Sequence, residues 1–273
     1  LAIIITFFLR AGNGEFDTPT SPMPTFEELE TEIPTNLATQ IISSDGKILG
    51  TFFKENRTNV RYNEISPHVI NALISTEDER FFSHAGIDFK STFRAAIFLG
   101  KRGGASTITQ QLAKMLFSGA PKSKIDRIKQ KFREWIIAIR LEKNYTKEEI
   151  LTMYLNKFDF LNLAVGINSA SNTYFNTSPT NLNIQESATL VGMAKNPSYY
   201  NPNRFPERTK ERRNVVLRQM MRNGHFSKME LDSLKNLDLI LHFKKADHNE
   251  GIATYFREHL REEIQKLLLQ EDN

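Results

Sequence analysis

The sequence contains no cysteine among its 273 residues. This absence excludes a disulfide framework and metal sites built from thiolates, although it leaves the cellular compartment open. Long apolar runs are also scarce. The run at residues 1–9, LAIIITFFL, is much shorter than the roughly 20 residues that a spanning helix needs. We expect residues 1–10 to be the outer end of a transmembrane helix; a buried strand is the alternative.

The composition is typical of a globular protein, because 40% of the residues are hydrophobic and 25% are charged. The length allows one large domain or two small ones. Basic residues exceed acidic ones, which gives a formal net charge of +4 and a pI near 9.1. This balance favours an acidic partner such as a phosphate, an anionic lipid or a nucleic acid. Residues 11–35 are rich in Gly, Pro, Thr and Glu, which predicts a tether.

The chain from residue 36 to 65 has the pattern of a small β unit. Apolar residues flank Asp45-Gly46, a dipeptide that favours a hairpin turn. The stretch NVRYNEI at 59–65 is a candidate third strand. Ser66-Pro67 then combines a helix N-cap with a proline at the first helical position, so we expect helices from this point onwards.

Four further stretches fit a capping box, in which Ser or Thr is followed three residues later by Glu or Gln. They begin at Thr76, Thr107, Thr146 and Ser227. For Thr76 we expect no more than a helix start. For residues 106–111 we favour a binding role, because two glycines precede a row of polar groups that is richer than a cap needs. Helices are also expected at 184–194 and 207–223, and a strand is possible at LDLILHF, residues 237–243.

Three stretches between residues 76 and 134 carry polar groups that ordinary packing does not explain. In TEDERFFSHAG, charged residues adjoin aromatic ones; its key side chains are Glu77, Asp78, Phe81 and His84. GGASTITQQLAK joins a glycine hinge to hydroxyl, amide and ammonium groups; its key side chains are Ser106, Thr107, Gln110, Gln111 and Lys114. The start of a helix also offers free N–H groups to a phosphate.

The third stretch, RIKQKFREW, predicts a helix with two separate faces. At roughly 100° per residue, one stripe is apolar and is expected to face the core. It consists of Ile125, Ile128, Phe132, Trp135, Ile136 and Ile139. Arg127, Lys131 and Glu134 form a second stripe, roughly 120° away by the same arithmetic. This second stripe is either a solvated face with ordinary ion pairs or a set of charges that point together into a cleft.

Together the three stretches resemble the peptidoglycan glycosyltransferases of glycosyltransferase family 51, which occur alone or as the N-terminal half of class A penicillin-binding proteins. The first family motif, Glu-Asp-x-x-Phe-x-x-His-x-Gly, is met at residues 77–86. The second, Gly-x-Ser-Thr-x-x-Gln-Gln, is met at 104–111. The resemblance extends from about residue 36 to 225 and includes ILTMYLN at 150–156 and ESATLVGMAKNPSYYNP at 186–202.

This resemblance implies a mainly α, lysozyme-like fold with two lobes around a cleft. It places the small β unit at 36–65, the glycosyltransferase domain at 66–225, and at 226–273 a linker towards a transpeptidase domain. The implied reaction joins the disaccharide units of lipid II into glycan strands, with inversion at the anomeric carbon and release of undecaprenyl diphosphate. An acceptor hydroxyl must lose its proton, and the leaving diphosphate needs cations and hydrogen-bond donors.

The resemblance also assigns roles to the motif residues. Glu77 matches the family's general base, and Glu134 matches its second carboxylate, which organises the cations near the diphosphate. Lys114 and Lys131 are expected to supply positive charge. The expected positioning residues for the substrate are Ser106, Thr107, Gln110 and Gln111. Asp78, Phe81 and His84 are expected to shape the site rather than react.

The sequence departs from the family pattern in two places. Gln130 stands where the third motif, Arg-Lys-x-x-Glu, has arginine, and glutamine cannot replace a planar cation that clamps a diphosphate. Arg127 or Arg133 are candidates to compensate. Apart from Gly166, LNLAVGIN at 161–168 lacks the Gly and Glu that are common in relatives. Ser44 and Lys47 match the Ser-x-x-Lys motif of transpeptidases, but a hairpin turn and the lack of Lys-Thr-Gly make this a coincidence.

The expected partners are lipid II, the growing glycan strand, the bacterial inner membrane and cell-wall synthesis proteins, but no nucleic acid. The catalytic domain is expected on the periplasmic or outer face of that membrane. No dedicated metal site is expected, although a divalent cation such as Mg²⁺ or Mn²⁺ is a candidate cofactor. We expect an apolar patch to contact lipid; it consists of Leu112, Met115, Leu116 and Phe117. Arg212 and Arg213 are either surface charges or part of the site.

Two other functions remain open at this point. A lytic enzyme that cleaves glycan strands with one acidic residue would explain Glu77, but neither the stripe of cations nor the apolar segment at residues 1–9. A non-catalytic module that binds anionic lipid or nucleic acid would explain the charge, but neither carboxylate.

Overall fold

The computed structural model describes residues 39–46, 48–52, 59–97, 104, 106–117, 123–244 and 259. The two strands are β1 (Thr39–Ile42) and β2 (Ile48–Phe52). The α-helices are α3 (Pro67–Glu77), α4 (Phe89–Ile97), α5 (Ile108–Phe117), α6 (Lys124–Asn144), α7 (Lys147–Lys157), α8 (Ile167–Phe175), α9 (Ile184–Met193), α10 (Pro206–Arg222) and α11 (Lys228–Asn236). Short 3₁₀ turns are η1 (Tyr62–Glu64), η2 (Phe81–Ser83) and η3 (Pro179–Asn181). The fold is mainly α, as predicted.

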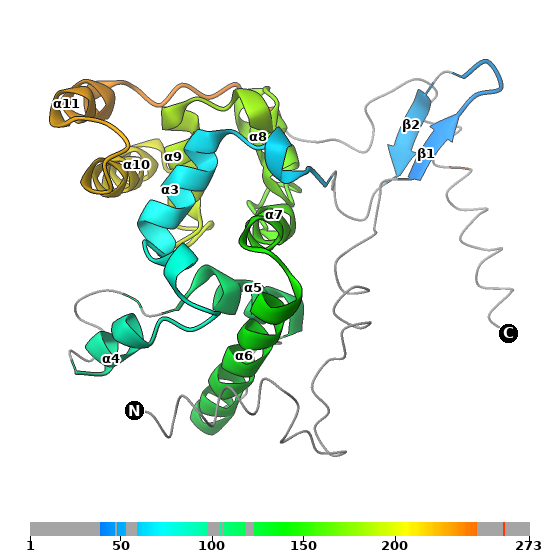
Figure 1. Cartoon of the computed structure of the whole chain (residues 1–273). Coiled ribbons are helices and arrows are strands. Elements are labelled where there is room, and N and C mark those ends of the chain that lie inside the picture. The colour runs from blue at the N-terminus through cyan, green and yellow to red at the C-terminus, as the bar shows by residue number, and fades with distance from the viewer. Residues whose placement is uncertain are drawn as a thin grey trace, which may run out of the picture.

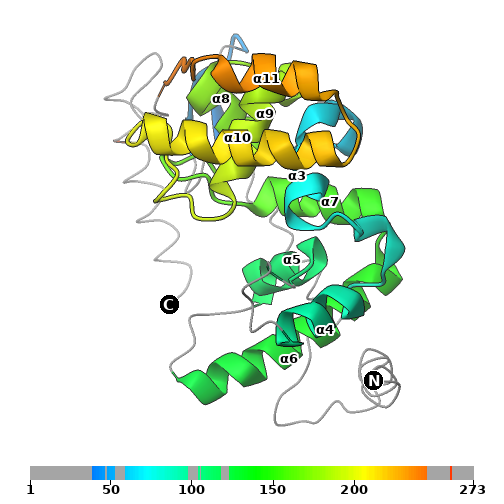
Figure 2. The ribbon, with the colours of Figure 1, turned by 90° about the vertical axis from the view of Figure 1, so that its left-hand side faces the viewer.

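The helices form two groups. In Figure 2, α8 to α11 gather at one end of the molecule and α4 to α6 at the other, with α3 and α7 between them. One large apolar core joins α3, α5 and α7 to α8, α9 and α10. A second, small core consists of Ile87 and of Ile139 on α6. The contact of α3 with α9 and α10 anchors the end of α3 that carries Glu77.

The predicted hairpin is present, since β1 pairs antiparallel with β2 across the Asp45-Gly46 turn, with an irregularity at Ile41/Ile42. The prediction of a third strand at residues 59–65 was wrong. Residues 62–64 form η1 instead, because the Glu64 carboxylate accepts a hydrogen bond from the Arg61 N–H and closes a turn. The predictions for residues 1–10 and 11–35 lie outside the described residues, as do Gly103 and most of 245–273.

The helix caps at Ser66, Thr146 and Ser227 are confirmed. Thr107 also caps, because its hydroxyl accepts from the Gln110 N–H at the start of α5. The prediction that a helix starts at Thr76 was wrong, because Thr76 lies near the C-terminal end of α3, which begins at Pro67. The helices α9 and α10 lie where they were predicted.

The segment after α11 is extended but forms no strand among the described residues up to 244. The backbone N–H groups of His242 and Lys244 donate to the carbonyl oxygens of Tyr174 and Thr173 at the end of α8. Earlier in the chain, the loop between α7 and α8 has an unusual backbone. Leu161, Asn162 and Leu163 have φ values of 63°, 54° and 63°, a left-handed conformation that side chains disfavour.

The apolar stripe of α6 is only partly covered. Its second half follows the prediction, since Ile139 is buried and Trp135 and Ile136 pack against the small core. Its first half does not, because Ile125, Ile128 and Phe132 are 65%, 59% and 47% exposed. Helix α4, which exposes Phe93 and Ile97, lies at the same end of the molecule as α6 in both views (Figures 1 and 2).

The predicted lipid patch on α5 is corrected by the structure. Leu112 and Leu116 are buried in the large core, and Met115 and Phe117 pack against it. These side chains hold α5 in place, which fixes the polar groups at its start. The solvent-facing apolar surface therefore belongs to α4 and the first half of α6, rather than to α5.

Candidate active site

Glu77 stands at the last residue of α3, where the helix opens into a turn. One carboxylate oxygen, Oε2, accepts a hydrogen bond of 3.0 Å from the Gln111 side-chain amide. The other, Oε1, lies 3.8 Å from a guanidinium nitrogen of Arg212. The Glu77 side chain is 17% exposed, so the carboxylate reaches solvent while its direction is fixed by two partners.

Asp78, the next residue, serves the scaffold. Its carboxylate accepts from the Ile108 N–H at the start of α5, a position where the helix dipole favours negative charge. The same carboxylate pairs with Nε2 of the buried His84 ring at 3.0 Å. Asp78 therefore ties the first motif to the helix that carries the second motif.

Gly86 joins the same motifs to α6. Its carbonyl oxygen accepts from the Thr107 hydroxyl at 2.7 Å and from the Gln110 amide at 3.3 Å. A Cβ at this position would lie 2.7 Å from the Ala138 carbonyl oxygen, and its φ is +86°, so only glycine fits here. Phe81 is fully buried beneath this junction. Asp78, Phe81, His84 and Thr107 thus build the wall behind the polar groups.

Glu134, on α6, is buried and locked in an ion pair. Its Oε2 lies 3.0 Å from the ammonium of Lys131, one turn earlier on the same helix. That ammonium also donates to the Ser106 hydroxyl at 3.0 Å. Of the predicted charged stripe, Glu134 is buried and Lys131 is held between Glu134 and Ser106, whereas Arg127 is exposed. Lys131 thereby links the second motif to the third.

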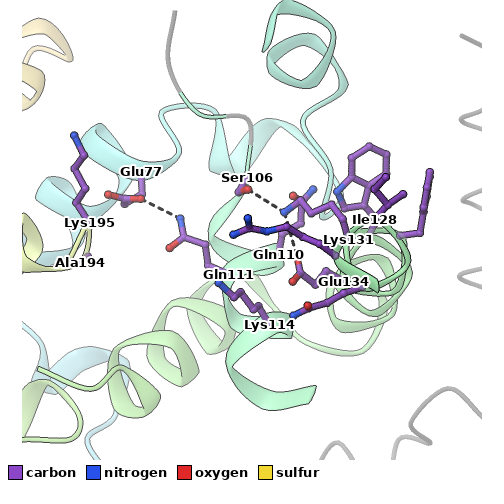
Figure 3. A pocket seen from close by; sticks show the side chains of 14 residues that line it. Glu77, Ser106, Gln110, Gln111, Lys114, Ile128, Lys131, Glu134, Ala194 and Lys195 are labelled. Carbon is purple, nitrogen blue, oxygen red and sulfur yellow. Dashed lines mark hydrogen bonds and ion pairs between the residues drawn. The ribbon is translucent and has the colours of Figure 1, made fainter. Parts of the chain in front are cut away.

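These groups surround one cavity of about 940 Å³. Figure 3 shows Glu77 and Gln111 on one side of it, and Ser106, Lys131 and Glu134 on the other. The full lining is Glu77, Ser106, Gln110, Gln111, Lys114, Arg127, Ile128, Gln130, Lys131, Phe132, Glu134, Trp135, Ala194 and Lys195. Carboxylates, cations and apolar side chains from residues 77 to 195 meet in this space.

A second hollow, of about 570 Å³, adjoins the first. Both are lined by Glu77, Ser106, Gln111 and Lys195, so Glu77 stands where they meet. The second hollow is more polar, with Asp78, Thr107 and three arginines in its wall: Arg94, Arg212 and Arg222. A carboxylate between two hollows has room for a separate ligand group on either side.

Lys195 was not among the predicted site residues, and the sequence left Arg212 open between a surface charge and part of the site. Lys195 lies in the stretch 186–202 that carried the family resemblance, so its place there was the available signal. Gly192, on α9, leaves room for Arg212: a Cβ there would lie 3.2 Å from the arginine Cγ, and its carbonyl accepts from Arg212 Nε. Arg213 is neither a surface charge nor in the site, because it is fully buried and donates to backbone carbonyls such as that of Leu237.

Comparison with known proteins decides the family. Residues 45–221 match the family model described as Transglycosylase. The chain belongs to the transglycosylase family. The predicted resemblance is therefore confirmed, and membership indicates a glycosyltransferase.

Two curated relatives of this transglycosylase chain are penicillin-binding proteins. Penicillin-binding protein 1F of Bacillus subtilis is 38% identical over 83% of this chain and 32% of the relative. Penicillin-binding protein 1A of Escherichia coli is 35% identical over 88% of this chain and 28% of the relative. The chain thus spans about a third of the length of the curated relatives it matches.

Among solved structures, penicillin-binding protein 1A from Haemophilus influenzae is similar, with 24% identity and a TM-score of 0.48 over 85% of this chain and 25% of that one. Within the described residues, no three His, Asp or Glu side chains are placed to hold a metal ion. No helix among the described elements is both long and apolar enough to cross a bilayer.

Proposed function

We propose that this transglycosylase chain polymerises lipid II into peptidoglycan glycan strands. The observation that carries the proposal is the 940 Å³ cavity, which has Glu77 at one side and the Lys131–Glu134 pair at the other. The reaction needs a base for the acceptor hydroxyl and positive charge for the leaving diphosphate. This cavity contains both, on separate walls.

Glu77 is the proposed general base. Its carboxylate keeps access to the cavity, and its direction is set by the Gln111 amide, so a sugar hydroxyl can approach a lone pair that the amide does not use. Proton removal makes that hydroxyl oxygen a stronger nucleophile towards the anomeric carbon of the donor. The position of Glu77 between the two hollows allows donor and acceptor to lie on either side of it.

The opposite wall is the proposed site of the diphosphate. Lys131, Lys114 and Arg127 line it, and the Ser106 hydroxyl points at the Lys131 ammonium. These cations stabilise negative charge as the bond between the anomeric carbon and the diphosphate breaks. Glu134 holds Lys131 in position rather than taking part in proton transfer. Gln130 also lines this wall, at the place where relatives have arginine.

The membrane is the proposed location, with the domain on its outer face. Ile125, Ile128 and Phe132 on α6, with Phe93 and Ile97 on α4, give this end of the molecule an exposed apolar surface. Because Ile128 and Phe132 also line the cavity, lipid II can remain in the bilayer while its headgroup enters. Two expectations remain predictions. Residues 1–10, which lie outside the described residues, are expected to be the end of a transmembrane helix, and residues 226–273 are expected to be a linker to a transpeptidase.

Liposome flotation tests this location. We expect Ile125→Ser with Ile128→Ser to reduce binding to vesicles that contain anionic lipid, with little change in Tm, because both side chains are exposed. Met229→Ser is the control, since Met229 is 81% exposed on α11, a helix that lies at the opposite end of the molecule from α6 (Figure 2). Equal binding by both variants would place the membrane elsewhere.

Incubation of the chain with purified lipid II, and separately with intact cell-wall glycan, tests the activity. We expect lipid II to be converted into polymer with release of undecaprenyl diphosphate, and the glycan to remain uncut. Cleavage of the glycan would instead identify a lytic enzyme. The cation wall argues against that alternative, because hydrolysis of a glycan releases no diphosphate. Addition of EDTA to the same assay tests whether polymerisation needs the predicted divalent cation. Cell-wall synthesis proteins remain predicted partners.

A further inference from the structure

A buried phenol stands behind the side chain that holds Glu77. Tyr154, on α7, is almost completely buried, and its hydroxyl donates to the Gln111 side-chain oxygen at 3.1 Å. The nitrogen end of the same amide donates to Glu77 Oε2 at 3.0 Å. Three helices are thereby connected in series, from α7 through α5 to the end of α3. Tyr154 lines neither the cavity nor the polar hollow.

The phenol and the carboxylate together set which way the amide faces. A glutamine amide has an accepting end and a donating end of nearly the same shape, so its orientation depends on its neighbours. If the amide were flipped, its oxygen would face the Glu77 carboxylate oxygen, and two acceptors would meet. While Glu77 is charged, that arrangement is unfavourable; once Glu77 has taken a proton, both orientations become possible for the amide alone.

The neutral form of Tyr154 strengthens the observed orientation. Burial, and then the negative charge of Glu77, raise the pKa of Tyr154 well above its ordinary value. The hydroxyl therefore keeps its proton and can donate to the Gln111 oxygen. The donor at this end and the carboxylate at the other together hold the amide N–H on the side of Glu77.

We propose that Tyr154 is a positioning residue for the transglycosylase reaction, acting through Gln111 to hold the Glu77 carboxylate in the orientation of a base. The proposal rests on the proposed role of Glu77. Tyr154 touches no substrate in this scheme. Its hydroxyl sets one amide, and the amide sets one carboxylate oxygen, which leaves the second oxygen for the acceptor hydroxyl.

A second buried phenol provides the matched control. Tyr174, on α8, is also fully buried, and its hydroxyl donates to the Phe160 carbonyl oxygen at 2.7 Å. It accepts from Asn162, and neither partner lines the two hollows. Tyr154→Phe and Tyr174→Phe therefore remove the same atom from comparably buried places, one connected to Glu77 and one not.

A double-mutant cycle tests the connection. With lipid II as substrate, we expect Tyr154→Phe to lower kcat about tenfold while KM changes less than about twofold. In a Gln111→Met background, which keeps the side-chain length but removes the amide, Tyr154→Phe should cause no further loss. Tyr174→Phe should lower Tm without changing kcat. An unchanged kcat in Tyr154→Phe, or a full further loss in the Gln111→Met background, would overturn the proposal.

A measurement without substrate separates this proposal from the proposed function. In ¹⁵N-labelled protein, the Gln111 side-chain amide signals are assigned by their loss in Gln111→Met. We expect these signals to shift in Glu77→Gln and to broaden or move in Tyr154→Phe, but to stay unchanged in Tyr174→Phe. A wild-type chain that fails to polymerise lipid II would refute the proposed function alone. Gln111 signals that stay unchanged in Tyr154→Phe would refute the positioning role, whatever the activity of the variant.

Discussion

Glu77 and Glu134 face the same cavity but are held in different ways. Glu77 has an amide at 3.0 Å and a guanidinium only at 3.8 Å, and its side chain is 17% exposed. Glu134 has an ammonium at 3.0 Å, and its side chain is 5% exposed. In the proposed mechanism this difference separates their tasks. The carboxylate without a close cation is the base, and the carboxylate in the close ion pair holds its cation in place.

The largest expected effect comes from Glu77→Gln. This change keeps the size of the side chain and most of its hydrogen bonding but removes proton acceptance. We expect lipid II polymerisation to fall at least about 100-fold, on the usual scale of general-base catalysis, with Tm nearly unchanged. Initial rates and a thermal melt measure both. Near-normal turnover would remove Glu77 from the mechanism and abolish the contrast between the carboxylates.

Glu134→Gln should have the next largest effect. It frees the Lys131 ammonium from its partner and lets it move from the diphosphate wall, so we expect a loss of about 30-fold in kcat. Lys131→Ala serves as the comparison, because it leaves Glu134 buried without a cation. That variant should lose about 1–2 kcal/mol of unfolding free energy in addition to activity, because Glu134 is buried while Lys131 is partly exposed. If Glu134→Gln were as inactive as Glu77→Gln, the two carboxylates would share the chemistry.

Gln130→Arg tests the diphosphate wall by adding a positive charge instead of removing an interaction. It restores a cation beside Lys131, and a charged hydrogen bond to the diphosphate can contribute roughly 1.5–3 kcal/mol, or about tenfold in rate if it acts only in the transition state. We expect a modest gain in the otherwise native chain. Because Arg133 is a candidate to occupy that place already, the gain should be larger with Arg133→Gln.

The same two variants also test whether the diphosphate binds at this wall. If the diphosphate bound elsewhere, Gln130→Arg would leave the polymerisation rate unchanged both in the native chain and with Arg133→Gln. Unchanged activity in Lys131→Ala would then confirm that this face of α6 does not bind the donor.

Arg212→Gln should have the smallest effect. The 3.8 Å separation from Glu77 indicates a weak ion pair, so we expect polymerisation to fall only about threefold, in the range of a weakly coupled pair. Arg222→Gln is the control, because Arg222 lines the same polar hollow, but Arg212 is the arginine that pairs with Glu77 among the described residues. A fall as large as that of Glu134→Gln would show that Glu77 depends on a cation as strongly as Glu134 does.

The sequence was informative wherever a short motif determines a local geometry. The Asp45-Gly46 turn, the Ser66 cap and the start of α5 at Thr107 follow from neighbouring residues alone. The motifs also predicted which polar groups meet, although 57 positions separate Glu77 from Glu134 in the chain. The family resemblance supplied this long-range information, which periodicity does not contain.

The sequence was misleading where a residue's role depends on what packs against it. The α6 stripe has one continuous period, but neighbouring elements cover only the turns near Ile139, and Ile125 is left exposed. In the same way, Arg213 looks like one of two ordinary surface charges. It is buried because carbonyl groups at the end of α11, such as that of Leu237, satisfy its guanidinium, and no spacing along the chain indicates that arrangement.

The loop at 161–163 has a consequence for thermal stability. Glycine enters the left-handed region freely, yet here Leu161 and Leu163 follow such a path. Each leucine costs the native state roughly 1–2 kcal/mol. The molecule therefore holds a reserve of stability in this loop, which a residue better suited to the left-handed backbone would release.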